Sequence, residues 1–445
     1  MKGIRFMKKI TLSLLLLALL ATVFFIHRQY SQRPVVTAVV QQAEHVEPLE
    51  KPKIIVFTSK GGAGHSSATQ AIKDTLGKQF NVISINVLTE ILGSLDPLVK
   101  LSRGKMSGED LVNISAKNNW LWIINKLRSI GIKLNARMLP QMKALIAQYL
   151  KKERPAMVIS VMPLINAATL GATQELDIPF LVVGTDIDTS LYVEGMHDVE
   201  KAQKFIYGMA FDEPLALQKV SHVIPKDKIR IVGFPLRSGF FEEKSEQKKA
   251  DIRKEFNIPD NKFVIMMIMG GAGSKKAYQF LRMLLRSSHD FHIIVCCGRN
   301  EKLLKKVEQL QTRSPKSMTV LGFTQQIADL MAVSDLFITK PGPNSIVEAL
   351  YMDLPMLIDA TDTILNWEKM NIDFVQQYGF GYIINKYKQV LPMLDALLTN
   401  KTSYATIKDA MQRFAKKNFP CNLKDVVQEL LPAMKIDKSG CIIKI

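Results

Sequence analysis

Two glycine-rich turns stand out because each follows an apolar, strand-like run and opens a helix-like run. The first turn covers residues 59–67 and the second covers residues 340–349. Glycines there let the backbone approach a ligand, and the helix that follows offers free N–H groups and the positive end of its dipole. Each turn therefore predicts an anion site, and two of them in separate halves of the chain predict a cleft between two domains.

His65, in the first turn, is the candidate for proton transfer. At a helix N-terminus facing the cleft, the imidazolium form is disfavoured, so we expect a neutral ring that accepts a proton. A capping or purely structural histidine is the alternative. A nucleotide-binding P-loop needs a lysine before its Ser/Thr, and His65 occupies that position. The turn therefore does not predict an ATPase.

The second half of the chain carries two matching turns, at 269–274 and 342–348, and both can direct N–H groups at a diphosphate. Glu348 falls in the helix that opens at Gly342, where a carboxylate can accept both hydroxyls of a ribose. Its alternative role is to meet the dipole of that helix. Lys340 either neutralises phosphate or is a surface lysine.

The sequence 186–188 has the Asp-x-Asp pattern of a metal site found in one class of sugar-nucleotide enzymes. It lies in the half of the chain away from the predicted diphosphate turns. We therefore predict no metal and no other cofactor.

The positive charge of the chain is concentrated. The net charge is +18, and half of it comes from residues 98–152, which hold eleven Lys or Arg and two acids, Glu109 and Asp110. Such a stretch attracts an anionic lipid surface or a nucleic acid. A solvated basic helix face is the alternative. The four cysteines have no zinc spacing and predict no disulfide framework.

The N-terminus predicts a membrane segment. Four basic residues precede the uncharged run 10–26, which is either a secretory signal or a short single-pass anchor. No convincing cleavage site lies beside it, which favours an anchor. The positive-inside rule places the rest of the chain outside the cytoplasm, although Arg28 and Arg33 on the far flank weaken that prediction.

The remainder alternates strand and helix. Strand-like runs at 54–57, 82–85, 157–161, 180–183, 205–207 and 229–232 form a first βαβ series. A second series has strand-like runs at 263–269, 292–297, 317–321, 336–339, 355–358 and 381–384. The break at 233–239 is read as the domain junction. Two parallel, doubly wound sheets would place the ends of their strands at a shared cleft, where ligands bind in such sheets.

These motifs together resemble the monogalactosyldiacylglycerol synthases and the processive diacylglycerol glucosyltransferases, relatives of the enzyme that adds N-acetylglucosamine to lipid I. The match runs from about residue 53 to about residue 382. Its pieces are Gly-Gly-x-Gly-His at 61–65, Ser-x-Met-Pro-Leu at 160–164, Thr-Asp at 185–186, Gly-x-Pro-x-Arg-x-x-Phe at 233–240, Met-Gly-Gly-Ala-Gly at 269–273, Gly-Phe at 322–323, Lys-x-Gly-Pro-x-Ser-x-x-Glu-Ala at 340–349, Glu368 and Asn371.

The resemblance implies the GT-B fold, which has two facing Rossmann-like domains, and an enzyme that needs no metal. The second domain would hold a UDP-sugar, and the first would hold a lipid acceptor at the bilayer. Together with the patterns above, we predict these domains: 1–27 signal anchor or signal peptide, 28–51 tether, 52–240 acceptor and membrane-docking domain, 241–390 UDP-sugar domain and 391–445 C-terminal helices. The basic stretch lies where the family docks on membranes, and we assign docking to Arg103, Lys105, Lys117, Trp120, Trp122, Lys126 and Arg128.

Three positions depart from the family pattern. Leu191 and Met162 stand where the family has histidines, which puts the acceptor and the activity in question. Trp367 stands in place of a glutamine near the donor sugar, which puts the sugar in question.

We therefore predict a membrane-associated enzyme that moves glucose or galactose from a UDP-sugar to a lipid hydroxyl, with no nucleic-acid partner. We place its body on the cytoplasmic face against the positive-inside rule, because UDP-sugars are cytoplasmic and the flanking charges are not decisively asymmetric. His65 is the expected base, and Asp186 orients the base or the acceptor. The expected substrate-binding residues are Gly62, Gly64, Gly270, Gly271, Gly273, Ser274, Phe323, Lys340, Gly342, Pro343, Ser345, Glu348, Glu368 and Asn371. A sugar-nucleotide epimerase of the same fold and a catalytically lapsed UDP-binding membrane protein are the alternatives.

Overall fold

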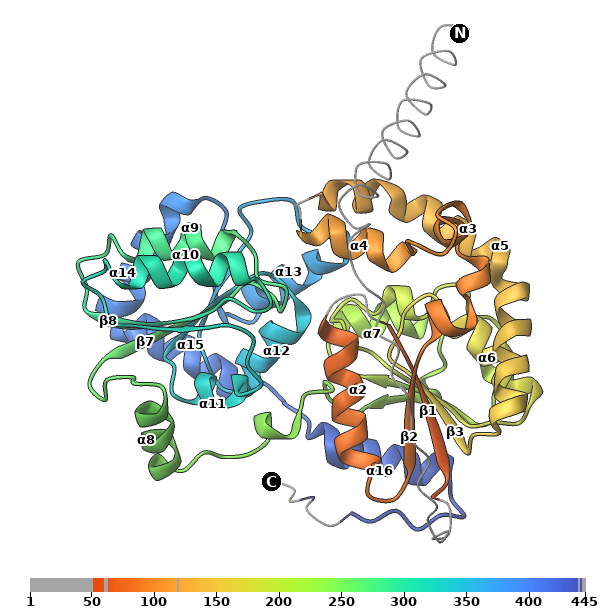
Figure 1. The fold of residues 1–445 in the computed structure, drawn as a ribbon. Helices are drawn as coiled ribbons and strands as arrows, with labels where there is room; N and C mark the ends of the chain where they lie inside the picture. The colour runs from red at the N-terminus through yellow and green to blue at the C-terminus, as the bar shows by residue number, and fades with distance from the viewer. Residues whose placement is uncertain (1–50, 60–62, 118–119, 439–440, 442–445) are drawn as a thin grey trace, which may run out of the picture. The chain divides into compact units, whose positions relative to one another are not determined.

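The computed structural model describes residues 51–59, 63–117, 120–438 and 441. These residues form two parallel six-stranded sheets within one compact unit, Lys51–Ile445 (Figure 1). The predicted anchor and nearly all of the predicted tether fall in residues 1–50, outside the described residues. The domain limits given above stay predictions.

The first sheet consists of β1 (Lys53–Thr58), β2 (Asn81–Asn86), β3 (Met157–Ser160), β4 (Phe180–Val183), β5 (Phe205–Met209) and β6 (Ile229–Ile231). Their order is β2-β1-β3-β4-β5-β6, and all neighbours are parallel. Each strand begins and ends within two residues of the run that predicts it. The parallel order places every strand's C-terminal end at one edge, which is where β1 runs into the first glycine turn.

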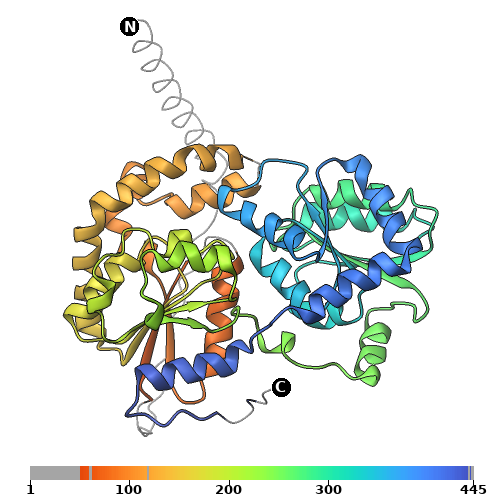
Figure 2. The ribbon, with the colours of Figure 1, turned by 180° about the vertical axis from the view of Figure 1, so that it is seen from behind.

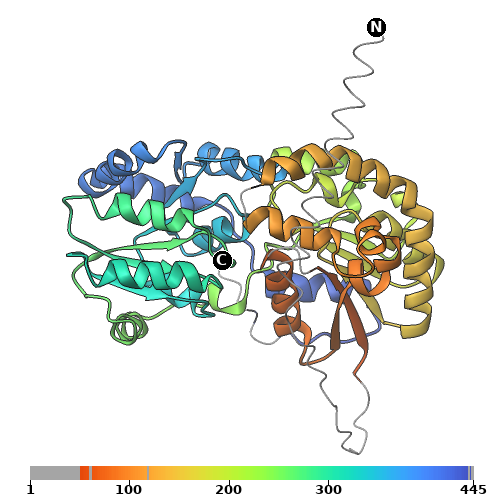
Figure 3. The same ribbon diagram turned by 45° about the horizontal axis from the view of Figure 1, so that its top comes forward.

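The helices that follow these strands are α2 (Ala63–Leu76), α3 (Pro97–Leu101), α4 (Gly108–Lys117), α5 (Leu121–Glu153), α6 (Asn166–Glu175) and α7 (Pro214–Ser221). Short turns are η1 (Val87–Ile91), η2 (Gly93–Leu95), η3 (Ser190–Tyr192), η4 (Val199–Lys201), η5 (Lys226–Lys228) and η6 (Ser238–Phe240). Helices α4 and α5 lie within or overlap the basic stretch 98–152, and Figure 3 shows them with the top of the molecule turned toward the viewer.

The second sheet consists of β7 (Phe263–Ile268), β8 (Phe291–Cys296), β9 (Met318–Leu321), β10 (Leu336–Thr339), β11 (Met356–Asp359) and β12 (Gly381–Ile384). Their order is β12-β11-β10-β7-β8-β9, again parallel throughout. Strands β7 and β10 are neighbours, so the two glycine turns that follow them emerge side by side at the C-terminal edge of this sheet.

Its helices are α8 (Glu246–Glu255), α9 (Lys276–Leu284), α10 (Glu301–Gln311), α11 (Ile327–Ala332), α12 (Pro343–Tyr351), α13 (Lys369–Gln377), α14 (Val390–Thr399) and α15 (Lys401–Arg413), with the short turns η7 (Asn366–Glu368) and η8 (Tyr387–Gln389). Each sheet is buried on both faces, as parallel sheets are. In β1, for example, Ile54, Ile55, Val56 and Phe57 are all fully buried.

The last helix, α16 (Phe419–Leu430), returns to the first sheet and lies beside α2 (Figures 1 and 2). Its Leu423 and Val427 share a core with Ile54 and Val56 of β1. The chain therefore crosses between the sheets twice. The crossings meet at Gly233, whose φ is +88° and where a Cβ atom would lie 2.8 Å from the carbonyl oxygen of Lys417. Glycine is required there by conformation and by space.

One sequence prediction is wrong. The cysteines predict no disulfide, yet Cys421, in the first turn of α16, is bonded to Cys441. The pairing depends on the tail after α16 folding back toward the start of that helix, which spacing alone does not indicate. Cys296 and Cys297 are free and buried, as the apolar run around them suggests. Within the described ranges, no helix has the length and apolar character to cross a bilayer.

Candidate active site

His65 lies in the first turn of α2, immediately after the glycine turn that follows β1. Its Nδ1 atom is 2.8 Å from the carbonyl oxygen of Val161. A carbonyl can only accept, so Nδ1 carries the hydrogen and Nε2 is left with a lone pair in the neutral ring. Burial lowers the pKa of His65 below its usual value, which keeps the ring neutral. His65 therefore has the tautomer and charge state of a base.

A buried hydroxyl network lies behind this ring. The Thr185 hydroxyl is 3.3 Å from His65 Nδ1 and 2.6 Å from the hydroxyl of Tyr192. Tyr192 is buried, and its hydroxyl lies 3.2 Å from a carboxylate oxygen of Asp186. Asp186 is thus linked to His65 indirectly, through Tyr192 and then through either Thr185 or the Val161 carbonyl, which lies 3.4 Å from the Tyr192 hydroxyl. The backbone of Val161, rather than Asp186, orients the imidazole.

Asp186 has an unusual ionisation. Burial raises its pKa to about 7, and the negative charge of Glu368 adds to that rise, while the Tyr192 hydroxyl and Lys340 lower it. Glu368 and Lys340 belong to the part of the chain that forms the second sheet. Asp186 consequently senses charges from the other side of the cleft, and it titrates in the pH range where an acid or base is useful.

The neighbouring Asp188 behaves differently. Burial alone would raise its pKa, but hydrogen bonds from Ser190 and the Lys219 ammonium bring it below the usual value. Lys219 Nζ lies 3.2 Å from Asp188 Oδ2. The two carboxylates of the Asp-x-Asp sequence are therefore engaged by separate protein partners.

In the second half of the molecule, Lys340 lies between the two glycine turns. A Cβ atom on Gly270 would be 3.3 Å from the Lys340 side chain, and one on Gly342 would be 3.2 Å from its Nζ. Lys340 Nζ also pairs with Glu368 at 2.8 Å. An ammonium held between two turns rich in backbone N–H groups makes a strongly anion-attracting site.

The shape of the first of these turns requires glycine. Gly273 has φ of +73°, and a Cβ atom there would lie 2.0 Å from the carbonyl oxygen of Cys297. Gly270 also has a positive φ, and Gly271 accepts a hydrogen bond from the Arg299 N–H. Ser274 then accepts from the Lys276 N–H as α9 begins. The turn therefore packs closely against the backbone of residues 297–299.

The second turn opens α12, with Gly342 at the N-cap and Pro343 at the first helical position, where the missing proline N–H is not needed. Ser345 lies in the same first turn. Glu348 follows one turn later and is buried, and burial raises its pKa to about 7. Arg237, from the first crossing, lies 3.9 Å from Glu348 Oε1 and opposes that rise.

Four of the nine buried side-chain polar atoms that lack a hydrogen-bond partner among the described residues lie around this turn. They are Thr339 Oγ1, Asn344 Nδ2, Asn371 Oδ1 and Arg237 Nε. Asn371 is fully buried, and its Nδ2 donates to the carbonyl of Pro341 at 2.8 Å. Because buried polar groups in folded proteins normally have partners, this concentration points to a polar ligand site.

The two halves of the site meet at Gly64 and Asn344. A Cβ atom on Gly64 would lie 2.8 Å from Asn344 Oδ1, so the N-terminal turns of α2 and α12 approach each other directly. His65 and the Gly342 turn consequently lie close to each other where the two halves meet. Gly62, which is predicted to bind substrate, lies outside the described residues.

Phe323 lies on the surface. It is 54% exposed, and the Arg299 guanidinium lies 4.3 Å from the centre of its ring. The flat, exposed ring and the cation beside it can stack on a planar aromatic ligand.

Most of the predicted docking residues are exposed: Arg103, Lys105, Trp120, Trp122 and Lys126. Arg128 is different, because it is half-buried and its Nε is shielded from solvent, so it does not belong to the exposed face. The side chain of Lys117 lies outside the described part of the chain.

Sequence reasoning missed several site residues. Tyr192 gave no signal, because an isolated tyrosine before a valine looks like core. Glu109 did give a signal, because it is one of only two acidic residues in the basic stretch 98–152. It is buried, accepts a hydrogen bond from Asn86, and favours the charged form of His65. Asn344 and Arg299 lie beside motifs that the sequence singled out.

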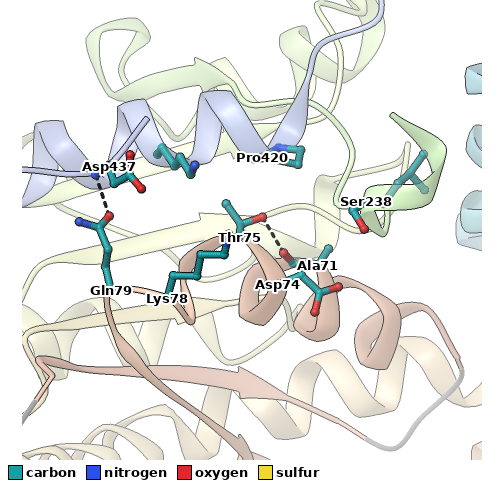
Figure 4. A pocket seen from close by; sticks show the side chains of 10 residues that line it. Ala71, Asp74, Thr75, Lys78, Gln79, Ser238, Pro420 and Asp437 are labelled. Carbon is teal, nitrogen blue, oxygen red and sulfur yellow. Dashed lines mark hydrogen bonds between the residues drawn. The ribbon is translucent and has the colours of Figure 1, made fainter. Parts of the chain in front are cut away.

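Two cavities lie away from these residues. One, of about 150 Å³, lies between α2 and α16 and is lined by Thr75, Gln79 and Pro420 (Figure 4). The other, of about 650 Å³, is lined by residues of the 190–197 loop, by Lys219 of α7 and by His222, which follows that helix. Neither is lined by His65 or Glu348.

Comparison with solved structures identifies the class of fold. MurG from Acinetobacter baumannii superimposes with a TM-score of 0.54 at 14% identity, covering 85% of this chain and 99% of MurG. The UDP-GlcNAc 2-epimerase of Neisseria meningitidis, bound to UDP-GlcNAc, superimposes with a TM-score of 0.51 at 15% identity. The match covers 85% of this chain and 100% of the epimerase chain. The two Rossmann-like sheets are therefore those of the GT-B fold.

The sequence comparisons give the relatives. Residues 265–417 match the Glycosyltransferase family 28 C-terminal domain. The processive diacylglycerol beta-glucosyltransferase of Staphylococcus saprophyticus is 25% identical over 81% of this chain and 88% of its own length. The chloroplastic monogalactosyldiacylglycerol synthase of Spinacia oleracea is 24% identical over 78% of this chain and 66% of its own length.

A processive diacylglycerol beta-glucosyltransferase from Bacillus pumilus is 28% identical over 46% of this chain. Here the matched part spans about half of the relative's length, 52%, and in the Bacillus licheniformis relative it spans 65%. The resemblance to diacylglycerol glycosyltransferases given above is thereby confirmed as distant homology.

Proposed function

We propose that this protein is a membrane-docked hexosyltransferase that moves glucose or galactose from a UDP-sugar to the hydroxyl of diacylglycerol. The observation that carries the proposal is the approach of α2 to α12 at Gly64 and Asn344. It brings the lone pair of His65 Nε2 into the same cleft as the glycine turns and Lys340. The relatives are a diacylglycerol glucosyltransferase and a monogalactosyldiacylglycerol synthase, and they indicate the classes of donor sugar and acceptor.

The chemistry is a single displacement. The acceptor oxygen attacks the anomeric carbon, its proton passes to His65 Nε2, and the bond from that carbon to the diphosphate oxygen breaks. The diphosphate leaves with both electrons of that bond. Lys340 and the amides of the Gly270 and Gly342 turns stabilise its charge. Glu348 holds the ribose, and Glu368 with Asn371 faces the sugar.

Docking follows from the outer face of α5. Residues three and four positions apart on this helix form one stripe of exposed apolar and basic side chains, which we name the docking stripe: Trp122, Lys126, Ile130, Lys133, Leu134 and Arg137. Trp122, Ile130 and Leu134 are 46%, 58% and 38% exposed. Apolar tips among cations fit an anionic bilayer surface.

The test uses the full chain with vesicles that contain diacylglycerol, supplied with UDP-glucose or with UDP-galactose. We expect glycolipid by mass spectrometry and one UDP released per sugar transferred. UDP binding without glycolipid from either donor would contradict the proposal and favour a lapsed UDP-binding protein. Conversion of UDP-GlcNAc to its C2 epimer, without transfer to lipid, would favour an epimerase.

The side of the membrane is tested separately. We place the body on the cytoplasmic face, because UDP-sugars are made there, although the Cys421–Cys441 disulfide and the N-terminal charges favour an oxidising compartment. Intact cells and lysed cells can be treated with an external protease. A cytoplasmic body is expected to be cleaved only after lysis, and cleavage in intact cells would contradict that placement.

A further inference from the structure

The loop 359–368 carries Glu368 and Trp367 to the sugar end of the site, and it is held at its start, middle and end. At the start, Lys276 Nζ lies 3.1 Å from Asp359 Oδ2 and donates to the Thr361 hydroxyl at 3.3 Å. At the end, Glu368 pairs with Lys340. These two holding residues, Lys276 and Lys340, belong to the same half of the molecule as the loop.

The middle of the loop is held from the other half. Asn125 of α5 donates from Nδ2 to the carbonyl of Ile364 at 2.8 Å, and its Oδ1 accepts from the N–H of Asn366 at 3.0 Å. Both polar ends of one amide side chain are thus bonded to the backbone of one loop. A pair of this kind fixes the position and the direction of the loop relative to α5.

Asn125 is also adjacent to the docking stripe. Trp122 and Lys126 lie three residues before it and one residue after it, and the Lys126 ammonium lies 5.1 Å from the Trp122 ring centre. Ile124 on the opposite side is buried. The same turn of α5 therefore presents a tryptophan and a lysine outward and holds the 359–368 loop on its inner side.

We infer that Asn125 is a positioning residue through which docking of α5 on an anionic bilayer strengthens binding of the UDP-sugar. The inference rests on the proposed function and adds regulation to it. When the bilayer fixes the first turns of α5, Asn125 fixes the loop. Glu368 and Lys340 then stand in the arrangement that the diphosphate and sugar require. Off the bilayer, the loop depends on its attachments within the second half: Lys276, Lys340 and the hydrogen bond from the Ala360 N–H to the Ile384 carbonyl.

The coupling is measurable as a ratio of two affinities. UDP is titrated calorimetrically into the full chain with phosphatidylcholine vesicles, and again with vesicles that also contain phosphatidylglycerol. For the natural sequence we expect UDP to bind about tenfold more tightly with the anionic vesicles, a typical size for coupling between two sites. High salt should remove the difference, because it screens the docking charges.

Asn125→Ala should bring this ratio close to one and raise the KM for UDP-glucose more than it changes kcat. Asn125→Asp keeps an acceptor for the Asn366 N–H but cannot donate to Ile364, so it should give an intermediate ratio. Asn135→Ala is the matched control, because Asn135 lies on the same helix and donates at 2.8 Å to Leu164, a carbonyl in its own half. It should keep the ratio of the natural sequence.

A natural-sequence ratio of one would overturn the inference and leave the proposed function standing. So would an Asn125→Ala protein with the full ratio, or an Asn135→Ala protein that loses it. A chain that binds no UDP under any condition would overturn the proposed function as well. Thermal unfolding of each variant identifies a protein that has lost its fold. If Asn125→Ala has done so, the ratio measured for Asn125→Asp tests the inference instead.

Discussion

The Nδ1 atom of His65 lies 2.8 Å from the carbonyl oxygen of Val161, a residue 96 positions further along the chain. That hydrogen bond fixes the tautomer of the ring and turns Nε2 into the proton acceptor. It is made at the C-terminal edge of the first sheet, where β1 and β3 lie side by side. The parallel order of the strands thus creates the candidate base.

His65→Ala should lower turnover by about 10²–10⁴-fold, the usual contribution of a general base, and leave UDP affinity unchanged. The natural enzyme should lose activity as pH falls through the depressed pKa of His65, because Nε2 is then protonated, and the variant should lack that dependence. Initial rates between pH 5 and 8 measure both. His222→Ala, at an exposed histidine, is the control. Loss of UDP binding in proportion to rate would assign His65 a structural role.

Glu348→Ala should weaken UDP binding by about 2–4 kcal/mol, since a charge-assisted pair of hydrogen bonds to the ribose is lost. The carboxyl has a pKa of about 7, and only its ionised form accepts from both hydroxyls. UDP affinity should therefore increase with pH between 6 and 8 more steeply in the natural protein than in Glu348→Gln. The comparison cancels ionisation of UDP itself. Calorimetry at three pH values decides, and equal slopes would remove the ribose assignment.

Asp186→Asn should change how stability depends on pH. The folded pKa of about 7 lies above the ordinary 3.8, so the folded state holds a proton that the unfolded state releases between these values. Stability contributed by this group is present at low pH and is lost as pH rises through 7. Asn keeps an acceptor for Tyr192 without the ionisation, so the variant should gain roughly 3 kcal/mol relative to the natural protein between pH 5 and 8.

Asp188→Asn gives the opposite sign and serves as the matched control. Its pKa is lowered, so its stabilising contribution is present at neutral pH and is lost as pH falls below the ordinary carboxyl range. The free energy of unfolding of this variant should be lower than that of the natural protein at pH 7, and the difference should be smaller at pH 4. Urea unfolding of both variants at each pH is the measurement. A parallel shift of the two variants would show that neither ionisation is coupled to folding.

Removing the docking stripe should release the protein from anionic vesicles. For residues 51–445, replacement of Trp122, Ile130 and Leu134 by serine, or of Lys126, Lys133 and Arg137 by alanine, should abolish flotation with phosphatidylglycerol vesicles. Each basic residue near such a surface contributes about 1 kcal/mol. The control replaces three exposed lysines of α10, Lys302, Lys305 and Lys306. Flotation that survives both stripe variants would show that another surface docks.

The local pattern of residues determined much of this molecule. A buried strand, a glycine turn and a helix form a continuous segment, so β1, β7 and β10 and the turns after them could be predicted from neighbours in the chain. The same is true of His65 at the start of α2 and Glu348 within α12, because a residue's place in a helix depends on short-range spacing. The order of the motifs carried the family resemblance.

Only the tertiary structure decided which distant groups meet. The Val161 carbonyl on His65, Asn125 on the 359–368 loop, α16 on the first sheet and Cys441 on Cys421 all join residues whose separation carries no periodic signal. The same holds for the burial that raises the pKa of Asp186 and Glu348. These contacts depend on how sheets and helices pack. Packing is the sum of many weak contacts between distant residues, so no local sequence pattern indicates it.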